Sequence, residues 1–386
     1  MLAADFSGKG YLDLATADYG DDMSLITVSL LLNNPVEYNP SVSYHATWDT
    51  MGISPASAAD FDGDGDIDVA VVAGPYMDGG TLYGGYLIIL SNLGDGTFQQ
   101  YAFTGVSDNQ PTTVVAADFN GDCHVDLATT RASSGDTDTY VDVLINRGDG
   151  TFYPPVSNMF TSEVGMLEGL VAADFSGDGF VDLAVATDGF AVATLINNGD
   201  GSFGQYTLYP VAGAPGSMVA ADFNQDGHID LATVSPTSAD RQYFDNRVSL
   251  LFNTGNGSFA PFKTTLTGRK PTSVSAADFD GDGRIDLVTA DVDYQNDDGT
   301  VSGSCASILL NTGGGSFAAP VKYYVTSEPI YVTAADLNND GSIDVALANF
   351  GNSTVTVLAN VGDGTFVYTP SAALADPLPV LPPLVR

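Results

Sequence analysis

The sequence has little positive charge. Lys and Arg together number 11 against 48 Asp and Glu, which gives a net charge of -37. Nearly all of this acid is aspartate, because the glutamates are only Glu37, Glu163, Glu168 and Glu328. Proteins that bind nucleic acid need a basic footprint, and proteins that bind anionic membrane surfaces need basic clusters. We therefore exclude both classes, and the charge favours cations as the first partners.

Histidine, cysteine and long apolar runs are also scarce. The two cysteines, Cys123 and Cys305, lie more than a hundred positions apart and are predicted to be buried small hydrophobic residues rather than a disulfide or a catalytic thiol. With three histidines, no Ser/His/Asp set, zinc cluster or phosphate loop can be assembled, so we expect no enzyme activity. No apolar run approaches the length of a membrane span, about 18 residues, and no signal peptide is visible.

Aspartate is abundant and regularly spaced. Residues 60–70 read DFDGDGDIDVA, which places Asp60, Asp62, Asp64, Asp66 and Asp68 at positions 1, 3, 5, 7 and 9 of a loop, with a glycine at position 6. Carboxylates at alternate positions, a main-chain carbonyl at position 7 and a sharp turn at position 6 are the elements of a calcium loop. Because an apolar run follows at once, we predict a strand–loop–strand site rather than an EF-hand. The alternative is an Asp-rich turn without metal.

The same loop recurs along the chain. Copies begin at residues 5, 60, 118, 174, 222, 278 and 336, which are 48 to 58 positions apart. A turn of the form N-x-G-D-G-T-F follows at 92, 146, 197, 253, 311 and 360, and only the first repeat lacks it. The intervening segments read as four short strands per repeat, bounded by Gly, Asn and Asp. Seven such repeats predict an all-β fold, a seven-bladed β-propeller of four-stranded antiparallel blades with calcium-binding loops.

These residues resemble the FG-GAP or VCBS repeat, which forms the propeller of integrin α subunits. The resemblance rests on A-A-D-F-x-G-D-G-x-x-D-L-A followed by N-x-G-D-G-T-F. It covers residues 1–369, with blades that begin near residues 1, 55, 112, 168, 216, 272 and 330, and leaves a Pro-rich tail at 370–386. It implies a secreted or surface-exposed protein and about six Ca²⁺ sites in blades 2 to 7.

The resemblance also implies the ligands of each ion. Positions 1, 3, 5 and 9 would contribute side-chain oxygens, and position 7 only its backbone carbonyl. The residues at positions 1, 3, 5, 7 and 9 are Asp60, Asp62, Asp64, Asp66 and Asp68 in blade 2; Asp118, Asn120, Asp122, His124 and Asp126 in blade 3; Asp174, Ser176, Asp178, Phe180 and Asp182 in blade 4; Asp222, Asn224, Asp226, His228 and Asp230 in blade 5; Asp278, Asp280, Asp282, Arg284 and Asp286 in blade 6; and Asp336, Asn338, Asp340, Ser342 and Asp344 in blade 7.

Two blades depart from the pattern. Blade 1 has Ser7 and Lys9 at positions 3 and 5, and we predict that the ammonium pairs with Asp5 and Asp13 and that no ion binds there. Blade 3 has Cys123 in place of the turn glycine, which predicts a strained loop. We expect blades 2 and 6 to bind calcium most tightly, because each has four ligand carboxylates. The interpretation we favour is that calcium stabilises the scaffold rather than carrying out the function itself.

The recognition surface is expected on the opposite face. Calcium loops and glycine turns share one face of antiparallel blades, whereas the loops at 74–86, 132–140, 235–247 and 291–304 vary in length and lie on the other. Candidate contact residues are Trp48, Tyr76, Tyr83, Tyr86, Tyr140, Tyr243, Phe244 and Tyr294, and the alternative is that several of them pack between blades. We expect adhesion or structural assembly, with a protein, a glycan or copies of the chain as partner. The alternatives are a lectin and a polysaccharide-active enzyme.

The chain ends raise a further expectation. Only MLAA precedes Asp5, and five prolines in the last 17 residues disfavour a central strand. We expect either that the sequence belongs to a longer protein or that a neighbouring chain completes the closure of the propeller.

Overall fold

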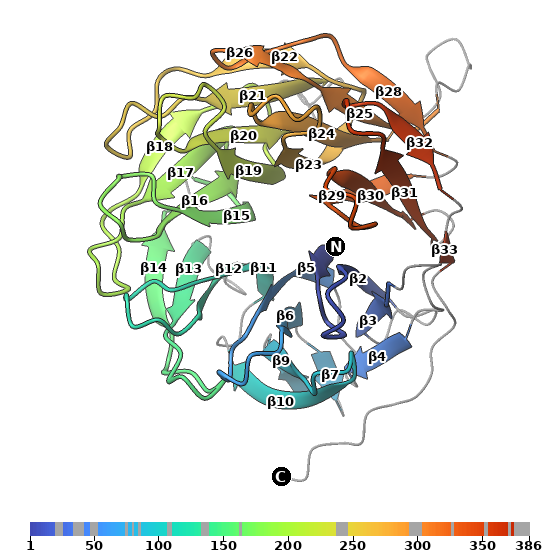
Figure 1. Ribbon diagram of the computed structural model, residues 1–386. Helices are drawn as coiled ribbons and strands as arrows, with labels where there is room; N and C mark the ends of the chain where they lie inside the picture. Colours follow the sequence, from blue (N-terminus) through green and yellow to red (C-terminus); the bar gives the residue numbers. More distant parts are fainter. Residues whose placement is uncertain are drawn as a thin grey trace. The chain divides into compact units, whose positions relative to one another are not determined.

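The structure, a computed structural model, is built of β-strands joined by turns and loops over the residues that it describes. It describes residues 1–19, 26–33, 42–46, 53–73, 76–78, 81–83, 86–105, 110–132, 139–161, 164–236, 246–292, 303–325, 328–350, 354–369 and 372–373. Within these ranges the strands form seven four-stranded antiparallel blades, which confirms the predicted fold class, the seven-bladed β-propeller (Figure 1). No helix in the described ranges is both long and apolar enough to span a membrane.

Blades 1 to 3 contain the first fourteen strands. Blade 1 consists of β1 (Leu2–Ala4), β2 (Asp13–Tyr19), β3 (Ile26–Leu31) and β4 (Val42–Ala46). Blade 2 consists of β5 (Ile53–Ala59), β6 (Asp68–Ala73), β9 (Tyr86–Asn92) and β10 (Phe98–Gly105), with a separate hairpin of β7 (Tyr76–Asp78) and β8 (Thr81–Tyr83). Blade 3 consists of β11 (Gln110–Ala117), β12 (Asp126–Ala132), β13 (Thr139–Leu144) and β14 (Val156–Phe160).

Blades 4 to 7 repeat this order. Blade 4 consists of β15 (Leu167–Ala173), β16 (Asp182–Thr187), β17 (Ala191–Leu195) and β18 (Thr207–Pro210); blade 5 of β19 (Ser217–Ala221), β20 (Asp230–Val234), β21 (Arg247–Leu251) and β22 (Lys263–Leu266). Blade 6 consists of β23 (Pro271–Ala277), β24 (Asp286–Asp291), β25 (Cys305–Leu309) and β28 (Val321–Tyr324), with a short hairpin of β26 (Asn311–Gly313) and β27 (Ser316–Phe317). Blade 7 consists of β29 (Pro329–Ala335), β30 (Asp344–Asn349), β31 (Thr354–Asn360) and β32 (Phe366–Tyr368), and β33 (Ala372–Ala373) also pairs with β31.

The chain divides into two compact units. Unit 1 comprises residues 1–170, 197–204 and 374–386, and unit 2 comprises residues 171–196 and 205–373. Unit 1 therefore holds blades 1 to 3 and the glycine turn of blade 4, whereas unit 2 holds most of blade 4 and all of blades 5 to 7.

The two middle strands of a blade form its core. Every residue of β16, β17, β20, β24 and β25 is buried, whereas the fourth strands β18, β22 and β28 are mostly exposed. This burial explains why the second and third strands read as nearly continuous apolar runs, since a strand covered on both faces has no polar side.

A pair of phenylalanines joins each blade to the next. The phenylalanine at position 2 of one Asp-rich loop meets, edge to face, the phenylalanine that ends the glycine turn of the following blade, at centroid distances of 5.6 to 6.3 Å. Such pairs add about 0.5–1.5 kcal/mol to the stabilisation from burial. The pairs are Phe6–Phe98, Phe61–Phe152, Phe119–Phe203, Phe175–Phe259, Phe223–Phe317 and Phe279–Phe366.

A buried asparagine makes a second connection at the same place. The first residue of each glycine turn donates a side-chain N–H to the main-chain oxygen of the position-2 residue in the preceding blade, always at 2.8 Å. We call these residues the latch asparagines; they are Asn92, Asn146, Asn197, Asn253, Asn311 and Asn360. The Asp-rich loop of one blade is thereby held against the glycine turn of the next.

Candidate metal centres

Each Asp-rich loop is the connection between the first and second strands of its blade. In blade 2 the loop leaves β5 at Asp60 and enters β6 at Asp68. The carboxylate of Asp60 accepts hydrogen bonds from the N–H groups of Gly63, at 2.7 Å, and Gly65, at 3.0 Å. Both glycines have a left-handed backbone, with φ of 79° and 96°, which side chains disfavour. The glycines therefore let the loop wrap around its own first carboxylate.

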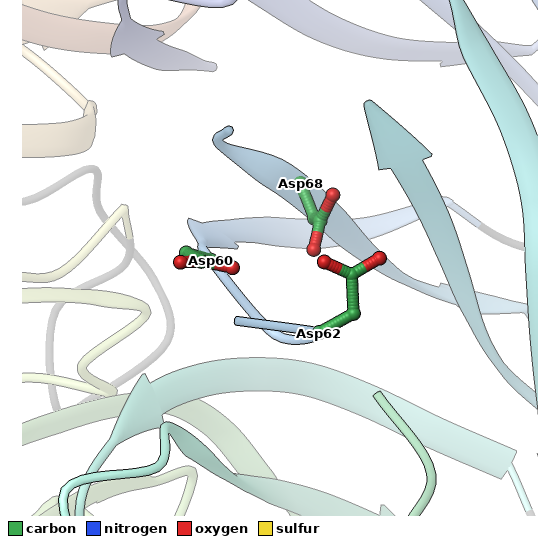
Figure 2. A group of neighbouring side chains, drawn as sticks. All are labelled: Asp60, Asp62 and Asp68. Carbon is green, nitrogen blue, oxygen red and sulfur yellow. The ribbon is translucent and has the colours of Figure 1, made fainter. Parts of the chain in front are cut away.

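Three carboxylates converge in the loops of blades 2 and 6. In blade 2, ligand oxygens of Asp60, Asp62 and Asp68 all lie within 4.8 Å of one another, and Figure 2 shows the three carboxylates gathered between the ends of the loop. The equivalent residues of blade 6, Asp278, Asp280 and Asp286, form the same group. Each group could hold a metal ion. The position-5 carboxylates belong to neither group.

The aspartate at position 9 is anchored by the backbone on both sides. Asp68 is completely buried, and its two oxygens accept the N–H groups of Phe61, at 2.9 Å, and of Asn92, at 2.8 Å. The same pair of donors, the position-2 residue and the latch asparagine, reaches Asp126, Asp230, Asp286 and Asp344. Position 9 thus joins its loop to the glycine turn of its own blade, a role that the loop spacing did not predict.

Burial disfavours the charged form of these aspartates. It raises the pKa of Asp68 to about 6, against the lowering effect of the two backbone hydrogen bonds, and the charges of Asp62 and Asp64 raise it further. Burial also raises the pKa of Asp126, Asp230 and Asp286 to about 6, and it raises the pKa of Asp13 and Asp344. A bound cation would supply the missing opposite charge. These hard oxygen donors suit Ca²⁺.

Blades 3, 4, 5 and 7 have a neutral residue at position 3. In blades 3 and 5 its amide N–H donates to the position-5 carboxylate, at 2.9 Å from Asn120 to Asp122 and from Asn224 to Asp226. In blade 4 the hydroxyl of Ser176 donates to Asp174 at 3.3 Å, and in blade 7 Asn338 accepts the N–H of Asp340 at 2.8 Å. At positions 1, 3, 5 and 9, each of these loops therefore carries one carboxylate fewer than the loops of blades 2 and 6.

Position 7 contacts the glycine turn of its own blade. Its N–H donates to the position-5 carboxylate, as from Asp66 to Asp64, and the same bond is made by His124, Phe180, His228, Arg284 and Ser342. In blades 2, 3 and 5 the side chain lies against the first glycine of the turn: a Cβ on Gly94 would lie 2.6 Å from Asp66, one on Gly148 would lie 2.6 Å from His124, and one on Gly255 would lie 2.7 Å from His228. The two histidines are therefore packed against turns rather than placed beside a nucleophile.

Lys9 of blade 1 does not reach the carboxylates with which it was predicted to pair. Its backbone N–H donates to Asp5 at 3.0 Å, and no ion pair to Asp5 or Asp13 is present in the described part of the chain. Hydrogen bonds from Thr97 lower the pKa of Asp95 in blade 2, and the charge of Lys9 lowers it further. That blade 1 binds no ion stays a prediction.

Cys123 adopts the backbone conformation of the glycine it replaces. Its φ is 70°, and its N–H donates to Asp118 at 2.8 Å. It is exposed, so the prediction that Cys123 is buried was wrong, because position 6 lies at the solvent-facing tip of the loop; Cys305 is buried as predicted. Because a left-handed conformation costs a residue with a side chain about 1 kcal/mol, we expect Cys123→Gly to stabilise the protein by about 0.5–1 kcal/mol, measured by thermal unfolding in reductant. Gly121→Ala, at φ 75° in the same loop, should do the opposite. Destabilisation by Cys123→Gly would contradict the assignment of strain.

The predicted recognition loops are largely outside the described residues, as are Trp48, Tyr243, Phe244 and Tyr294. Tyr76 and Tyr83 face each other in the register of β7 and β8, and Tyr86 begins β9. Tyr140 is half-buried beneath the guanidinium of Arg131, which lies 3.9 Å from the ring centroid. Of these aromatic residues, Tyr140 therefore has a packing role.

Part of the chain matches a known repeat family. The FG-GAP-like repeat family matches residues 131–185, 174–233 and 238–289. No curated protein sequence matches the chain.

Solved structures share the fold at low sequence identity. A lectin of Agrocybe aegerita that recognises non-reducing terminal N-acetylglucosamine is 18% identical, with a TM-score of 0.58 over 97% of this chain and 94% of the lectin. The periplasmic gluconolactonase of Pseudomonas aeruginosa is 16% identical, with a TM-score of 0.62 over 96% and 99%. BBS1N, solved in complex with ARL6DN, is 10% identical, with a TM-score of 0.57 over 90% and 87%. At these identities the likeness shows the fold alone.

Proposed function

We propose that this propeller of FG-GAP-like repeats is a calcium-stabilised module that acts outside the cell by binding a partner. The observation that carries the proposal is the convergence of three carboxylates, one of them buried, in the loops of blades 2 and 6. Like charges at this separation oppose folding unless a cation lies among them. The family resemblance and the all-oxygen donor set both favour calcium.

The position of the loops favours a stabilising role for the ion. Asp68 accepts the N–H of Asn92, and Asn92 in turn donates to the main chain of Phe6 in the preceding blade. An ion held by Asp68 would therefore fix the connection between two blades as well as its own loop. The match to FG-GAP-like repeats favours a surface or secreted location, where calcium modules bind with dissociation constants of about 0.1–1 mM.

We favour binding over catalysis because the carboxylates, histidines and thiol that could act as catalytic groups are engaged in packing or hydrogen bonds or are not ionised. In blades 2, 3, 5, 6 and 7 the position-9 carboxylate has both oxygens engaged by backbone N–H groups, and two of the three histidines pack against glycine turns. Burial raises the pKa of the Cys305 thiol to about 12, so it does not ionise near neutral pH. We propose that recognition uses the variable-loop face, with a protein, a glycan or another copy of the chain as partner.

Glycan binding is the second candidate, because a lectin is among the proteins of the same fold that cover nearly the whole chain. A polysaccharide-active enzyme on the same scaffold is the third. Binding to a glycan array that persists only in calcium would favour a lectin, and release of sugar from polysaccharide would establish an enzyme. Calcium-dependent association of purified chains, followed by sedimentation and electron microscopy, would favour assembly.

Removal of calcium is expected to lower the melting temperature. A site filled at ten times its dissociation constant stabilises the folded state by about 1.4 kcal/mol. The measurement is thermal unfolding of the full chain in 1–10 mM calcium, in chelator, and in magnesium at the same ionic strength as the control. A melting temperature unchanged by chelator would show that calcium does not stabilise this fold.

A further inference from the structure

The loops of blades 2 and 6 form a natural matched pair. They read DFDGDGDID and DFDGDGRID, so they differ only at position 7, which is Asp66 in one and Arg284 in the other. Their three converging carboxylates are equivalent. The difference between the sites is therefore confined to one side chain, and it amounts to two units of charge.

Arg284 is held against the carboxylate at position 5. Its Nη2 donates to Oδ2 of Asp282, with which it forms an ion pair, and its backbone N–H donates to Oδ1 of the same residue at 2.9 Å. Its Nε donates to the main-chain oxygen of Asn311, at 2.7 Å, in the glycine turn of the blade. With side-chain exposures of 33% and 25%, the two side chains are partly shielded from solvent. Two hydrogen bonds from the guanidinium, together with the backbone bond of the same residue, thus fix Arg284 in place.

Asp64 of blade 2 has no such partner. Its Oδ1 accepts the N–H of Asp66 at 2.9 Å, and within the described ranges no cation is paired with its Oδ2. The side chain of Asp66 lies beside Gly94 in the glycine turn of blade 2. Arg284 contacts the equivalent turn of blade 6. Across the other blades, position 7 is Tyr11, His124, Phe180, His228 or Ser342, so Arg284 is the one permanent cation at this position of the loops.

We infer that Arg284 acts as an internal counter-ion that weakens the blade 6 site for divalent cations, so that blade 2 is the tighter of the two matched sites. The inference rests on the proposed function, and it refines the expectation from ligand count, which named blades 2 and 6 together as the tightest sites. The affinity of a calcium site depends on the charge of its ligands. A guanidinium on Asp282 cancels one of these charges, and it also repels an incoming cation.

The test replaces Arg284 by the residue that blade 7 has at this position. Arg284→Ser should tighten calcium binding at the blade 6 site about tenfold, because one positive charge near the site is removed. Arg147→Ser is the matched control: Arg147 is exposed in the glycine turn of blade 3, where it lies over the ring of Tyr153, and its loss changes the net charge equally. Calcium binding to the full chain, stripped of metal, is measured by titration calorimetry and by thermal unfolding against calcium concentration.

Two further variants assign the effect to a site. Adding Asp280→Asn to Arg284→Ser should abolish the gain, because Asp280 belongs to the converging group of blade 6. Asp66→Arg should produce the reverse change, a loss of about tenfold at blade 2, and it remains informative if Arg284→Ser folds poorly.

The possible results distinguish the role of Arg284 from the proposal that calcium binds and stabilises the propeller. A wild-type chain that binds calcium, with Arg284→Ser and Arg147→Ser identical within twofold, overturns the role of Arg284 alone. A wild-type chain that binds no calcium and melts at the same temperature in chelator overturns both. A tenfold gain that survives Asp280→Asn places the effect elsewhere and also overturns the inference.

Discussion

Replacement of Asn253 by alanine is expected to lower the free energy of unfolding by about 3–5 kcal/mol. The side-chain N–H groups of this buried latch asparagine donate to the main-chain oxygens of Phe175 in the preceding blade, at 2.8 Å, and of Ile229 in its own loop, at 3.0 Å. Its Oδ1 accepts the N–H of Gly255 at 2.9 Å. Alanine would leave three backbone groups unpaired, and each that stays buried costs about 1–3 kcal/mol.

The measurement is chemical unfolding at constant calcium. Asn198→Ala is the control for a change of the same residue type, because Asn198 is exposed and bonds only locally through its side chain, to Ser202 at 3.0 Å; its effect should stay within about 0.5 kcal/mol. Asn253→Asp keeps the size but removes the donors, and it should be at least as destabilising as alanine. If Asn253→Ala behaves like Asn198→Ala, the latch asparagines do not hold the blades together.

The latch asparagines make contacts between blades that could not be predicted from the sequence. The seven loops and their glycines were predictable, because carboxylate spacing and left-handed turns are local properties of about nine residues. The contact from Asn253 to Phe175 spans 78 positions, and it exists only when two blades are packed. The asparagine was visible in the N-x-G-D-G-T-F pattern, but only as the start of a turn.

The aspartate at position 9 of the candidate sites also makes contacts that local sequence spacing could not predict. Asp68 was predicted as a metal ligand from its place in the loop, and the structure brings it together with Asp60 and Asp62. Its two backbone bonds, to Phe61 and Asn92, depend on the pairing of β6 with β9 and were not predictable from spacing. At position 7 the pattern predicted a backbone role only, whereas the side chain of Arg284 reaches both the loop and the turn.

Asp291 is a buried carboxylate that no motif indicated. It ends β24, where it accepts hydrogen bonds from Thr289 at 3.0 Å and Ser307 at 2.5 Å, and it is 1% exposed. Burial raises its pKa to about 7; the two hydroxyl bonds and the charge of Lys322 oppose this rise, and the thiol of Cys305 donates to it at 3.6 Å. In blade 7 the equivalent last residue of β30 is Asn349, which has no charge.

The comparison of Asp291 with Asn349 predicts that Asp291→Asn raises the free energy of unfolding by an amount that depends on pH. In the wild type the folded state binds the proton of Asp291 up to about pH 7, whereas the unfolded state releases it near pH 4. The folded state therefore holds more protons in this range, and stability falls as pH rises from about 4 to about 7. Asparagine removes this loss, and its N–H can donate to Ser307 as Asn349 donates to Thr356 at 2.8 Å.

Asp291→Asn should consequently stabilise the protein by about 2–4 kcal/mol at pH 8 and by less than about 1 kcal/mol at pH 4.5. Urea unfolding of both proteins at the two pH values, in the same buffer, isolates the contribution of this group. Asp142→Asn is the contrasting control, because Asp142 is also buried but is paired with Arg131 at 2.5 Å. Its replacement should destabilise the protein at both pH values, since a buried guanidinium would lose its partner. A gain from Asp291→Asn that is equal at pH 4.5 and pH 8 would show that the carboxylate is charged throughout this range, because only a group that titrates between the two values makes the difference depend on pH.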